Sequence, residues 1–136
     1  MRVTHLITRL IVGGAQENTV ASVLGMRTRH GVDVRLISGP TSGTEGSLEA
    51  LFAGTPDLFS VEPALVRPVH SWFDLLALVR LTRTLRLHQP HIVHTHSGKA
   101  GVIGRLAAKR ARVPIIVHTI HGPSFGAFQG KLANAA

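Results

Sequence analysis

The alternation of short apolar runs with longer helical patterns constrains the fold of this chain more than any other feature. Five runs rich in β-branched and aliphatic residues are predicted strands, separated by loops and by patterns with helical spacing. The predicted strands cover residues 2–8, 32–38, 58–61, 91–96 and 114–122. The predicted helices cover residues 15–31, 71–90 and 98–112, with a shorter one at 47–54. This rhythm predicts an α/β fold: a Rossmann-like parallel sheet of at least five strands, with helices on both faces.

Three segments with binding chemistry come directly after predicted strands. Gly13 and Gly14 follow the first strand, Ser97 and Lys99 follow the fourth, and His121 follows the fifth. Ligands of open parallel sheets bind beyond the carboxyl ends of the strands, so these segments are expected to meet at one edge. The two glycines lead into a helix, where they form either an anion site made of backbone N–H groups or a tight turn without a ligand.

The stretch at residues 93–111 places Lys99 in a glycine frame where a predicted strand becomes a helix. This setting is typical of phosphate binding, but the spacing excludes a P-loop, because Val93 stands where that motif needs a glycine and Ala100 where it needs Ser or Thr. The glycines are also spaced GxxGxxG, which does not fit the dinucleotide motif. An unrelated Rossmann-like nucleotide binder is therefore disfavoured. Lys99 is either a solvated residue of the first helical turn or a cation kept for a ligand.

Composition restricts the partners. Fifteen Lys and Arg against seven Asp and Glu give a net charge of +8, which favours anionic partners. With five Phe, one Trp and no Tyr, the chain lacks the aromatic surface that single-stranded nucleic acids stack on, so no nucleic acid is expected. Cysteine is absent, no apolar run approaches the ~20 residues of a membrane span, and the N-terminus is predicted to be a strand. These features predict a cytoplasmic protein.

Five histidines lie close together in the last third of the sequence: His91, His94, His96, His118 and His121. His94 and His96 share a strand face, but they have no carboxylate or cysteine neighbours at ligand spacing, so no metal site is expected. His94 and His118 are instead predicted to be buried or partly buried and bonded to backbone groups. His121 differs because it lies where the last strand leaves the sheet.

A basic helical face is the second charged feature. Arg80, Arg83 and Arg86 recur every three residues on the side opposite a row of leucines, which is the ordinary pattern of a solvated face. Four further basic residues belong to the next predicted helix and its end: Arg105, Lys109, Arg110 and Arg112. Together these side chains also suit contact with an anionic membrane surface.

The chain resembles the N-terminal domain of family 4 retaining glycosyltransferases, also called glycosyltransferase group 1, which have the GT-B fold. The matching segments are "ITRLIVGGAQENT" (7–19), "HIVHTHSGKAGVIGRLAAKRARVPIIVHTIHG" (91–122) and Phe125. The resemblance implies one half of a GT-B fold, in which the first Rossmann-like domain binds the acceptor and the second holds most of a nucleotide-sugar donor. It implies no separate cofactor.

The resemblance also assigns roles to residues. It implies that Gly13 and Gly14 approach the donor diphosphate and that His121 contacts the transferred sugar as a catalytic residue. Ser97 and Lys99 are implied contacts on the side of a sugar or lipid-linked acceptor.

The length departs from that family, whose members are more than twice as long. We therefore expect a single domain over 1–136, with the C-terminal donor-binding domain absent and no hexosyltransferase activity from this chain alone. The expected function is the acceptor-binding half of a retaining glycosyltransferase, at the inner face of the membrane if it is peripheral. The alternative is a stand-alone, non-catalytic binding domain that pairs with a separate donor-binding protein.

Overall fold

A computed structural model describes residues 1–42 and 46–121 of the protein. The strands are β1 (Arg2–Ile7), β2 (Asp33–Ser38), β3 (Phe59–Val61), β4 (Ile92–His96) and β5 (Ile115–Thr119). The helices are α1 (Gly14–His30), α2 (Ser71–His88) and α3 (Gly98–Arg110), with a 3₁₀ turn at Glu49–Phe52. Every predicted element is present with its bounds displaced by a few residues at most. The predicted residues Gly122 and Phe125 lie outside the described part of the chain.

The five strands form one parallel sheet in the order β3-β2-β1-β4-β5. The polypeptide runs from β1 through β2 to β3 at one edge of the sheet. It then crosses back and adds β4 and β5 on the other side of β1. The strand order therefore reverses between β1 and β4, and this is where sheets of this type open a crevice for ligands. The predicted parallel α/β architecture is confirmed.

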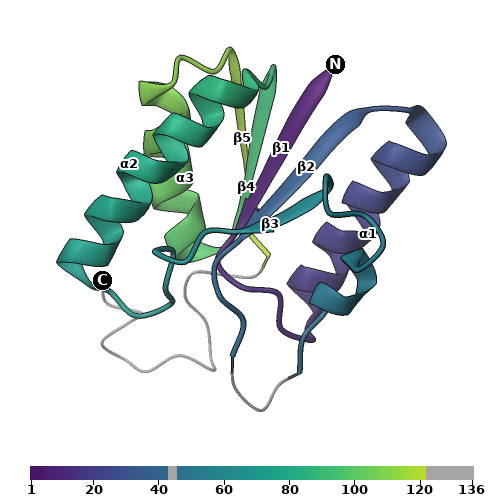
Figure 1. Ribbon diagram of the computed structural model, residues 1–136, viewed down its shortest axis with the longest axis horizontal. Coiled ribbons are helices and arrows are strands. Elements are labelled where there is room, and N and C mark those ends of the chain that lie inside the picture. The colour runs from purple at the N-terminus through teal and green to yellow at the C-terminus, as the bar shows by residue number, and fades with distance from the viewer. Residues whose placement is uncertain (43–45, 122–136) are drawn as a thin grey trace.

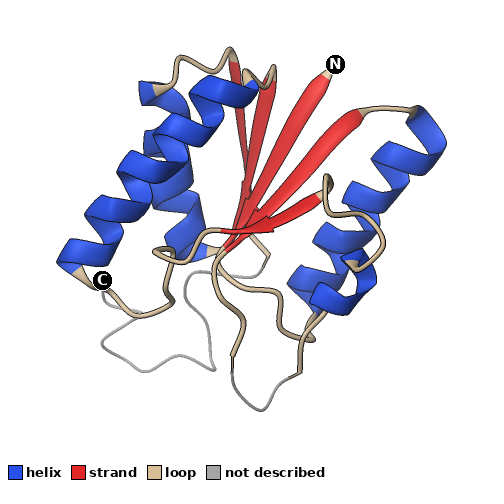
Figure 2. Ribbon diagram, viewed as in Figure 1, coloured by secondary structure: helices blue, strands red, loops and turns tan. Residues whose placement is uncertain are grey.

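Helices cover both faces of the sheet, as Figures 1 and 2 show. Helix α1 packs on one face with a core that includes Val3, Val23 and Leu36. Helices α2 and α3 lie side by side on the other face, over a core that includes Leu6 and Val93. The sheet is thus the middle layer of three.

The helices leave β5 partly uncovered. Ile115, Ile116 and Val117 are 38–51% exposed, although they form as apolar a run as the central strands. The reason is position: β5 is an edge strand, and α1 packs against β1 and β2 on the far side of β4. An apolar run in the sequence therefore predicts a strand, but it does not predict whether a helix covers that strand.

Helix α2 begins and ends at local signals. His70 caps its start, because the His70 Nδ1 accepts the Phe73 backbone N–H at 3.2 Å while Asp74 accepts the His70 N–H at 3.1 Å. The helix ends at His88, after which Gln89 adopts a left-handed φ of 49° just before Pro90. The N-terminal cap fixes the position of Asp74, which forms an ion pair with Lys99.

The glycines of the 93–111 stretch allow α3 to pack closely on the sheet. A Cβ at Gly101 would lie 2.4 Å from the His118 ring, and one at Gly104 would lie 2.7 Å from the Thr95 side chain. Both distances are far inside van der Waals contact, so α3 approaches β4 and β5 only because these positions have no side chain. Helix–sheet packing therefore explains the glycines at positions 101 and 104 of the GxxGxxG pattern, but not Gly98, where a Cβ would meet no atom of the described residues within 4 Å.

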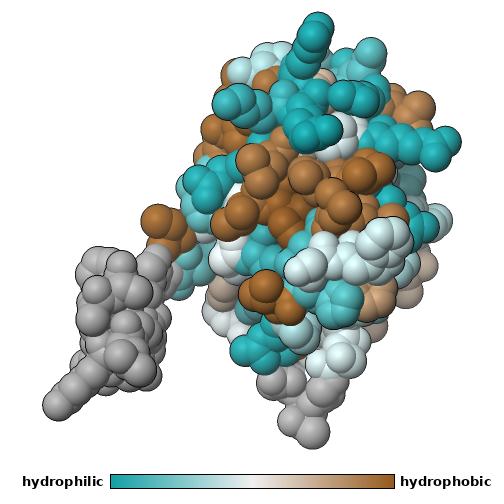
Figure 3. Space-filling model, turned by 90° about the vertical axis from the view of Figure 1, so that its left-hand side faces the viewer, coloured by the Kyte–Doolittle hydropathy of each residue, from teal (hydrophilic) through white to brown (hydrophobic). Residues whose placement is uncertain are grey.

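The outer surface of α2 and α3 combines apolar and basic side chains. Figure 3 shows apolar residues gathered in the middle of this face with hydrophilic residues around them. The large exposed apolar side chains of the two helices include Leu75, Val79, Val102 and Leu106. Within the described residues, no helix is both long and apolar enough to span a bilayer.

Gly104→Ala is expected to lower the free energy of unfolding by about 1–3 kcal/mol, because the new methyl group overlaps Thr95 and Leu6 side-chain atoms at 2.7–2.8 Å. The matched control is Gly25→Ala in α1, where a Cβ meets open space among the described residues. That variant should gain about 0.5–1 kcal/mol of stability. Chemical denaturation of both variants measures the difference, and equal effects would contradict the packing role of Gly104.

Candidate functional site

The carboxyl ends of β1 and β4 border a pocket of about 260 Å³ at the point where the strand order reverses. It is lined by Thr8, Arg9, Gln16, Arg67, Ser97, Gly98 and Lys99. Sequence reasoning had singled out Ser97 and Lys99 of this set, with Gly98 between them in the glycine frame, and missed the other four. The loop after β1, the first turn of α1 and the segment before α2 supply the missed residues, and only the folded chain brings them together.

Hydroxyl groups join the two sides of this pocket. The Thr8 hydroxyl accepts the Ala100 backbone N–H at 3.1 Å and is bonded to the Ser97 hydroxyl at 3.3 Å. Ser97 has a left-handed φ of 63°, and its hydroxyl donates to the His96 carbonyl at 2.6 Å. A non-glycine residue with this φ is strained, and such strain persists where the surrounding structure fixes it. Thr8 therefore caps α3 from β1 and holds the turn at Ser97.

Lys99 lines the pocket, but its charge already has a partner. The Lys99 ammonium forms an ion pair with Asp74 and donates to the Pro68 carbonyl, and only 12% of its side chain is exposed. Partial burial works to raise the pKa of Asp74, but the bonds from Lys99 and the His70 backbone outweigh it and leave the pKa below its usual value. Lys99 is thus neither a freely solvated lysine nor an unpaired cation.

The two glycines lie beside the pocket and do not line it. Gly13 is the N-cap of α1 in extended backbone with φ −178°, and Gly14 begins the helix. A Cβ at Gly13 would lie 2.8 Å from the Gln16 amide oxygen, so the glycine leaves room for Gln16 to reach the pocket. Within the described residues, the Gly13 cap supplies no side-chain acceptor for the first turn of α1, whose N–H groups suit an anion.

A chain of histidines leads from the middle of the sheet to His121. The rings of His5 and His96 are bonded at 2.9 Å (Nδ1 to Nε2), and those of His96 and His121 at 2.8 Å (Nδ1 to Nε2). His5 and His96 are fully buried on the α1 face, and His121 is half-buried at the end of β5. Sequence reasoning missed His5, because nothing in the sequence shows that β1 pairs with β4.

The buried imidazole rings of this row of histidines are neutral. Burial, and then the neighbouring His94, lowers the pKa of His5 to about 3. Burial, followed by the surrounding histidines, lowers the pKa of His96 to about 2 and also lowers that of His121. Each neutral ring carries one N–H, so each bond in the chain needs one donor and one acceptor.

The unpaired ring nitrogen of His5 indicates which histidine donates in each of these hydrogen bonds. The Nε2 of His5 is buried without a hydrogen-bond partner among the described residues. A buried unpaired N–H is rarer than a buried unpaired acceptor, so His5 places its proton on Nδ1 and donates to His96. His96 then donates from Nδ1 to the Nε2 of His121. His121 therefore carries its own proton on Nδ1, the nitrogen that does not face His96.

The histidines also include a group with metal-ligand chemistry. One nitrogen each from His5, His94 and His96 lies within 4.8 Å of the others, and imidazole is a common zinc ligand. The sequence-based expectation of no metal did not consider His5 together with His94 and His96, and it stays a prediction. The expectation that His94 and His118 bond to backbone groups is wrong: they bond the hydroxyls of Thr119 at 2.5 Å and Thr95 at 2.9 Å, because strand pairing places threonines beside them.

Acid is expected to destabilise the protein through the buried histidines. His5 and His96 have folded-state pKa values below the ordinary 6.5, so the unfolded chain binds protons first as the pH falls. Stability is therefore complete above about pH 7 and falls below pH 6.5, by up to about 1.4 kcal/mol per pH unit for each ring. His5→Gln removes one such ring and should make this slope shallower.

Urea denaturation at several values between pH 4.5 and 7.5 measures the slope for the wild type and the variant. His30→Gln, at the exposed end of α1, is the matched control and should leave the slope unchanged. If the stability of His5→Gln and of the wild type falls with the same slope, the buried histidines are not the cause of the acid destabilisation.

Comparison with known proteins identifies relatives of this chain. Residues 13–136 match the family model of the glycosyl transferase 4-like domain. The chain is 38% identical over 103 residues to the UDP-Gal:alpha-D-GlcNAc-diphosphoundecaprenol alpha-1,3-galactosyltransferase of Escherichia coli. That alignment covers 73% of this chain and 24% of the relative, so the chain spans about a quarter of the relative's length.

Solved structures share the fold at low sequence identity. MurG of Acinetobacter baumannii superposes with a TM-score of 0.62 at 18% identity, covering 86% of this chain and 33% of MurG. The UDP-GlcNAc 2-epimerase of Methanocaldococcus jannaschii gives 0.63 at 11% identity, covering 98% of this chain and 34% of the epimerase. At these identities the likeness establishes the architecture and nothing about the reaction.

Proposed function

The chain belongs to the glycosyl transferase 4-like domain family, and from this premise we propose that it is the acceptor-binding half of a retaining glycosyltransferase. The complete enzyme moves a sugar from a nucleotide-sugar donor to an acceptor. One observation carries the proposal: the pocket that contains Ser97 and Lys99 opens at the strand-order reversal, beside the N-terminus of α1. In open α/β sheets this is the usual place for a ligand.

The donor diphosphate is assigned to the start of α1. Gly13 and Gly14 leave the backbone of the first turn accessible, and its N–H groups together with the helix dipole favour an anion. A diphosphate there is next to the pocket that Gln16 lines from the same turn. The second, donor-binding domain of the complete enzyme closes over the diphosphate and excludes water.

His121 is assigned to the transferred sugar. Its Nε2 is occupied by His96, so Nδ1–H is the group that donates to a sugar hydroxyl or to a phosphate oxygen of the leaving nucleotide. Because burial lowers the pKa of His121, the ring is neutral at pH 7 and acts as a hydrogen-bond donor, not as a charged acid. A donor aimed at charge that develops in the transition state raises turnover more than binding.

The acceptor is assigned to the side of the pocket formed by Ser97 and Lys99. Arg9 and Arg67 line the same pocket and make it basic, which suits an acceptor whose sugar is carried on a diphosphate. The name of the Escherichia coli relative describes such an acceptor, a GlcNAc-diphosphoundecaprenol. The apolar and basic outer surface of α2 and α3 supports a peripheral position on the inner face of an anionic membrane, where such lipids are reached.

His121→Ala is expected to lower kcat by about 10²-fold or more in the complete transferase, meaning this domain together with its donor-binding domain. The physical reason is the loss of a positioned N–H donor at the reacting sugar. Steady-state transfer from UDP-sugars to a polyprenyl-diphosphate-linked GlcNAc measures kcat, and NMR of the product tests whether the anomeric configuration is retained.

His30→Ala is the matched control, since this exposed histidine lies at the far end of α1. A folded His121→Ala enzyme with near-wild-type kcat would make the histidine structural. If acceptor analogues bind but no donor supports transfer, the domain is a non-catalytic binding module instead.

Lys99→Ala should act mainly on the acceptor, raising its KM about tenfold or more while kcat changes little, as expected for a lost charge-assisted hydrogen bond. The substitution also leaves Asp74 without its partner. The double variant Lys99→Ala/Asp74→Asn removes that unpaired charge, so it should recover thermal stability but not KM. Recovery of both by the double variant would mean that Lys99 only holds α2 in place.

A further inference from the structure

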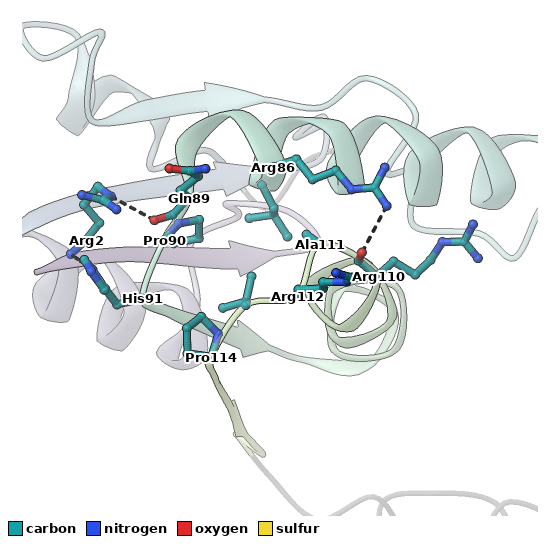
Figure 4. A pocket seen from close by; sticks show the side chains of 11 residues that line it. Arg2, Arg86, Gln89, Pro90, His91, Arg110, Ala111, Arg112 and Pro114 are labelled. Atoms are coloured by element: carbon teal, nitrogen blue, oxygen red, sulfur yellow. Dashed lines mark hydrogen bonds between the residues drawn. The ribbon is translucent and has the colours of Figure 1, made fainter.

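A second and larger pocket lies at the opposite edge of the sheet, where β1 begins and where α2 and α3 end (Figure 4). Its volume is about 660 Å³, within the ~300–1,000 Å³ typical of small-molecule sites. Leu85, Pro90 and Val113 contribute apolar side chains to its lining. The site described above does not include any of this pocket's lining residues.

Four arginines surround this second pocket, which we call the arginine pocket: Arg2, Arg86, Arg110 and Arg112. No Asp or Glu is among the described residues that line it. The ion pairs found in the described part of the chain involve Arg27, Arg80 and Lys99, and none includes these four. Asp33 is the strand neighbour of Arg2, so Arg2 is the most compensated of the four.

Basic residues at helix C-termini commonly offset the helix dipole, and two of the arginines do so here. Arg86 donates to the Arg110 carbonyl at 3.2 Å, and Arg2 Nε donates to the Gln89 carbonyl at 2.9 Å. Each helix end carries only about half a negative charge, so two ends offset about one of the four positive charges. The dipoles offset about one of the four charges and Asp33 offsets part of the charge of Arg2, which leaves an excess of about two positive charges.

The pocket keeps hydrogen-bond donors for a ligand. An arginine has five N–H donors, and the bonds above each use one. The ring of His91 accepts the Arg2 backbone N–H at its Nδ1 at 3.0 Å, so a neutral His91 carries its proton on Nε2 as a further donor. Guanidinium groups bind phosphate oxygens in pairs, which makes arginine the side chain best suited to this class of anion.

We propose that the arginine pocket binds a phosphate-bearing ligand, as a site separate from the one assigned to donor and acceptor. The excess charge, the acid-free lining, the apolar side chains within the lining and the unused N–H donors all fit a phosphate group attached to a larger body. Two sources offer this chemistry: the headgroup of an anionic phospholipid and a soluble phosphorylated compound. The proposal does not depend on the glycosyl-transfer assignment, because the two pockets lie at opposite edges of the sheet.

The test uses pyrophosphate as the soluble probe and vesicles containing 30% phosphatidylglycerol as the lipid probe. Titration calorimetry measures the first and vesicle flotation the second, both at fixed ionic strength. The pocket variant is Arg110→Gln/Arg112→Gln, which spares the two capping arginines. The control Arg27→Gln/Arg29→Gln removes the same charge from α1, which lies outside the pocket and on the other face of the sheet from α2 and α3.

We expect the pocket variant to weaken binding of at least one probe by tenfold or more, while the control stays within about threefold of the wild type. Loss of pyrophosphate binding identifies a soluble phosphate ligand, and loss of flotation alone identifies a lipid headgroup. Binding of neither probe overturns the proposal, as does an equal loss in the pocket variant and the charge-matched control. Circular dichroism of each variant confirms that the fold is retained.

Discussion

The pairing of β1 with β4 is the contact on which the rest of this structure depends. It brings together segments about ninety residues apart, Val3 beside Ile92 and His5 beside His94, and reverses the direction in which the sheet grows. The carboxyl ends of the two strands then border the crevice. The Thr8 hydroxyl caps α3 across this junction, so the same pairing also fixes the turn that carries Ser97 and Lys99.

The described part of the structure contains two polar networks, one neutral and one charged. On the α1 face the histidine chain is neutral, and the Nε2 of His5 is buried there without a hydrogen-bond partner among the described residues. Between α2 and α3 the Lys99–Asp74 pair is charged and sits near the surface. Burial decides the difference, because imidazole gives up its charge when desolvated whereas lysine and aspartate keep theirs by pairing.

The positive charge of the protein is not spread evenly over the sheet. Arg9, Arg67 and Lys99 lie at the carboxyl edge, and Arg2, Arg86, Arg110 and Arg112 surround the amino-terminal edge. Parallel strands make the two edges chemically different, with helix N-termini at one and helix C-termini at the other. Arginines at the second edge first satisfy helix carbonyls, and the charge beyond that need is what distinguishes the arginine pocket from ordinary capping.

The sequence by itself determined the class of the fold and nearly every element, because strand and helix patterns depend on residues that are neighbours in the chain. It also determined that Ser97 and Lys99 follow β4 and that no standard phosphate motif is present. Only the tertiary structure decided that His5 joins His96, that Asp74 neutralises Lys99, that Gly101 and Gly104 serve packing, and that β5 is left half-covered. These facts depend on which strands and helices become neighbours in space, and contacts between residues far apart in the chain leave no periodic signal in it.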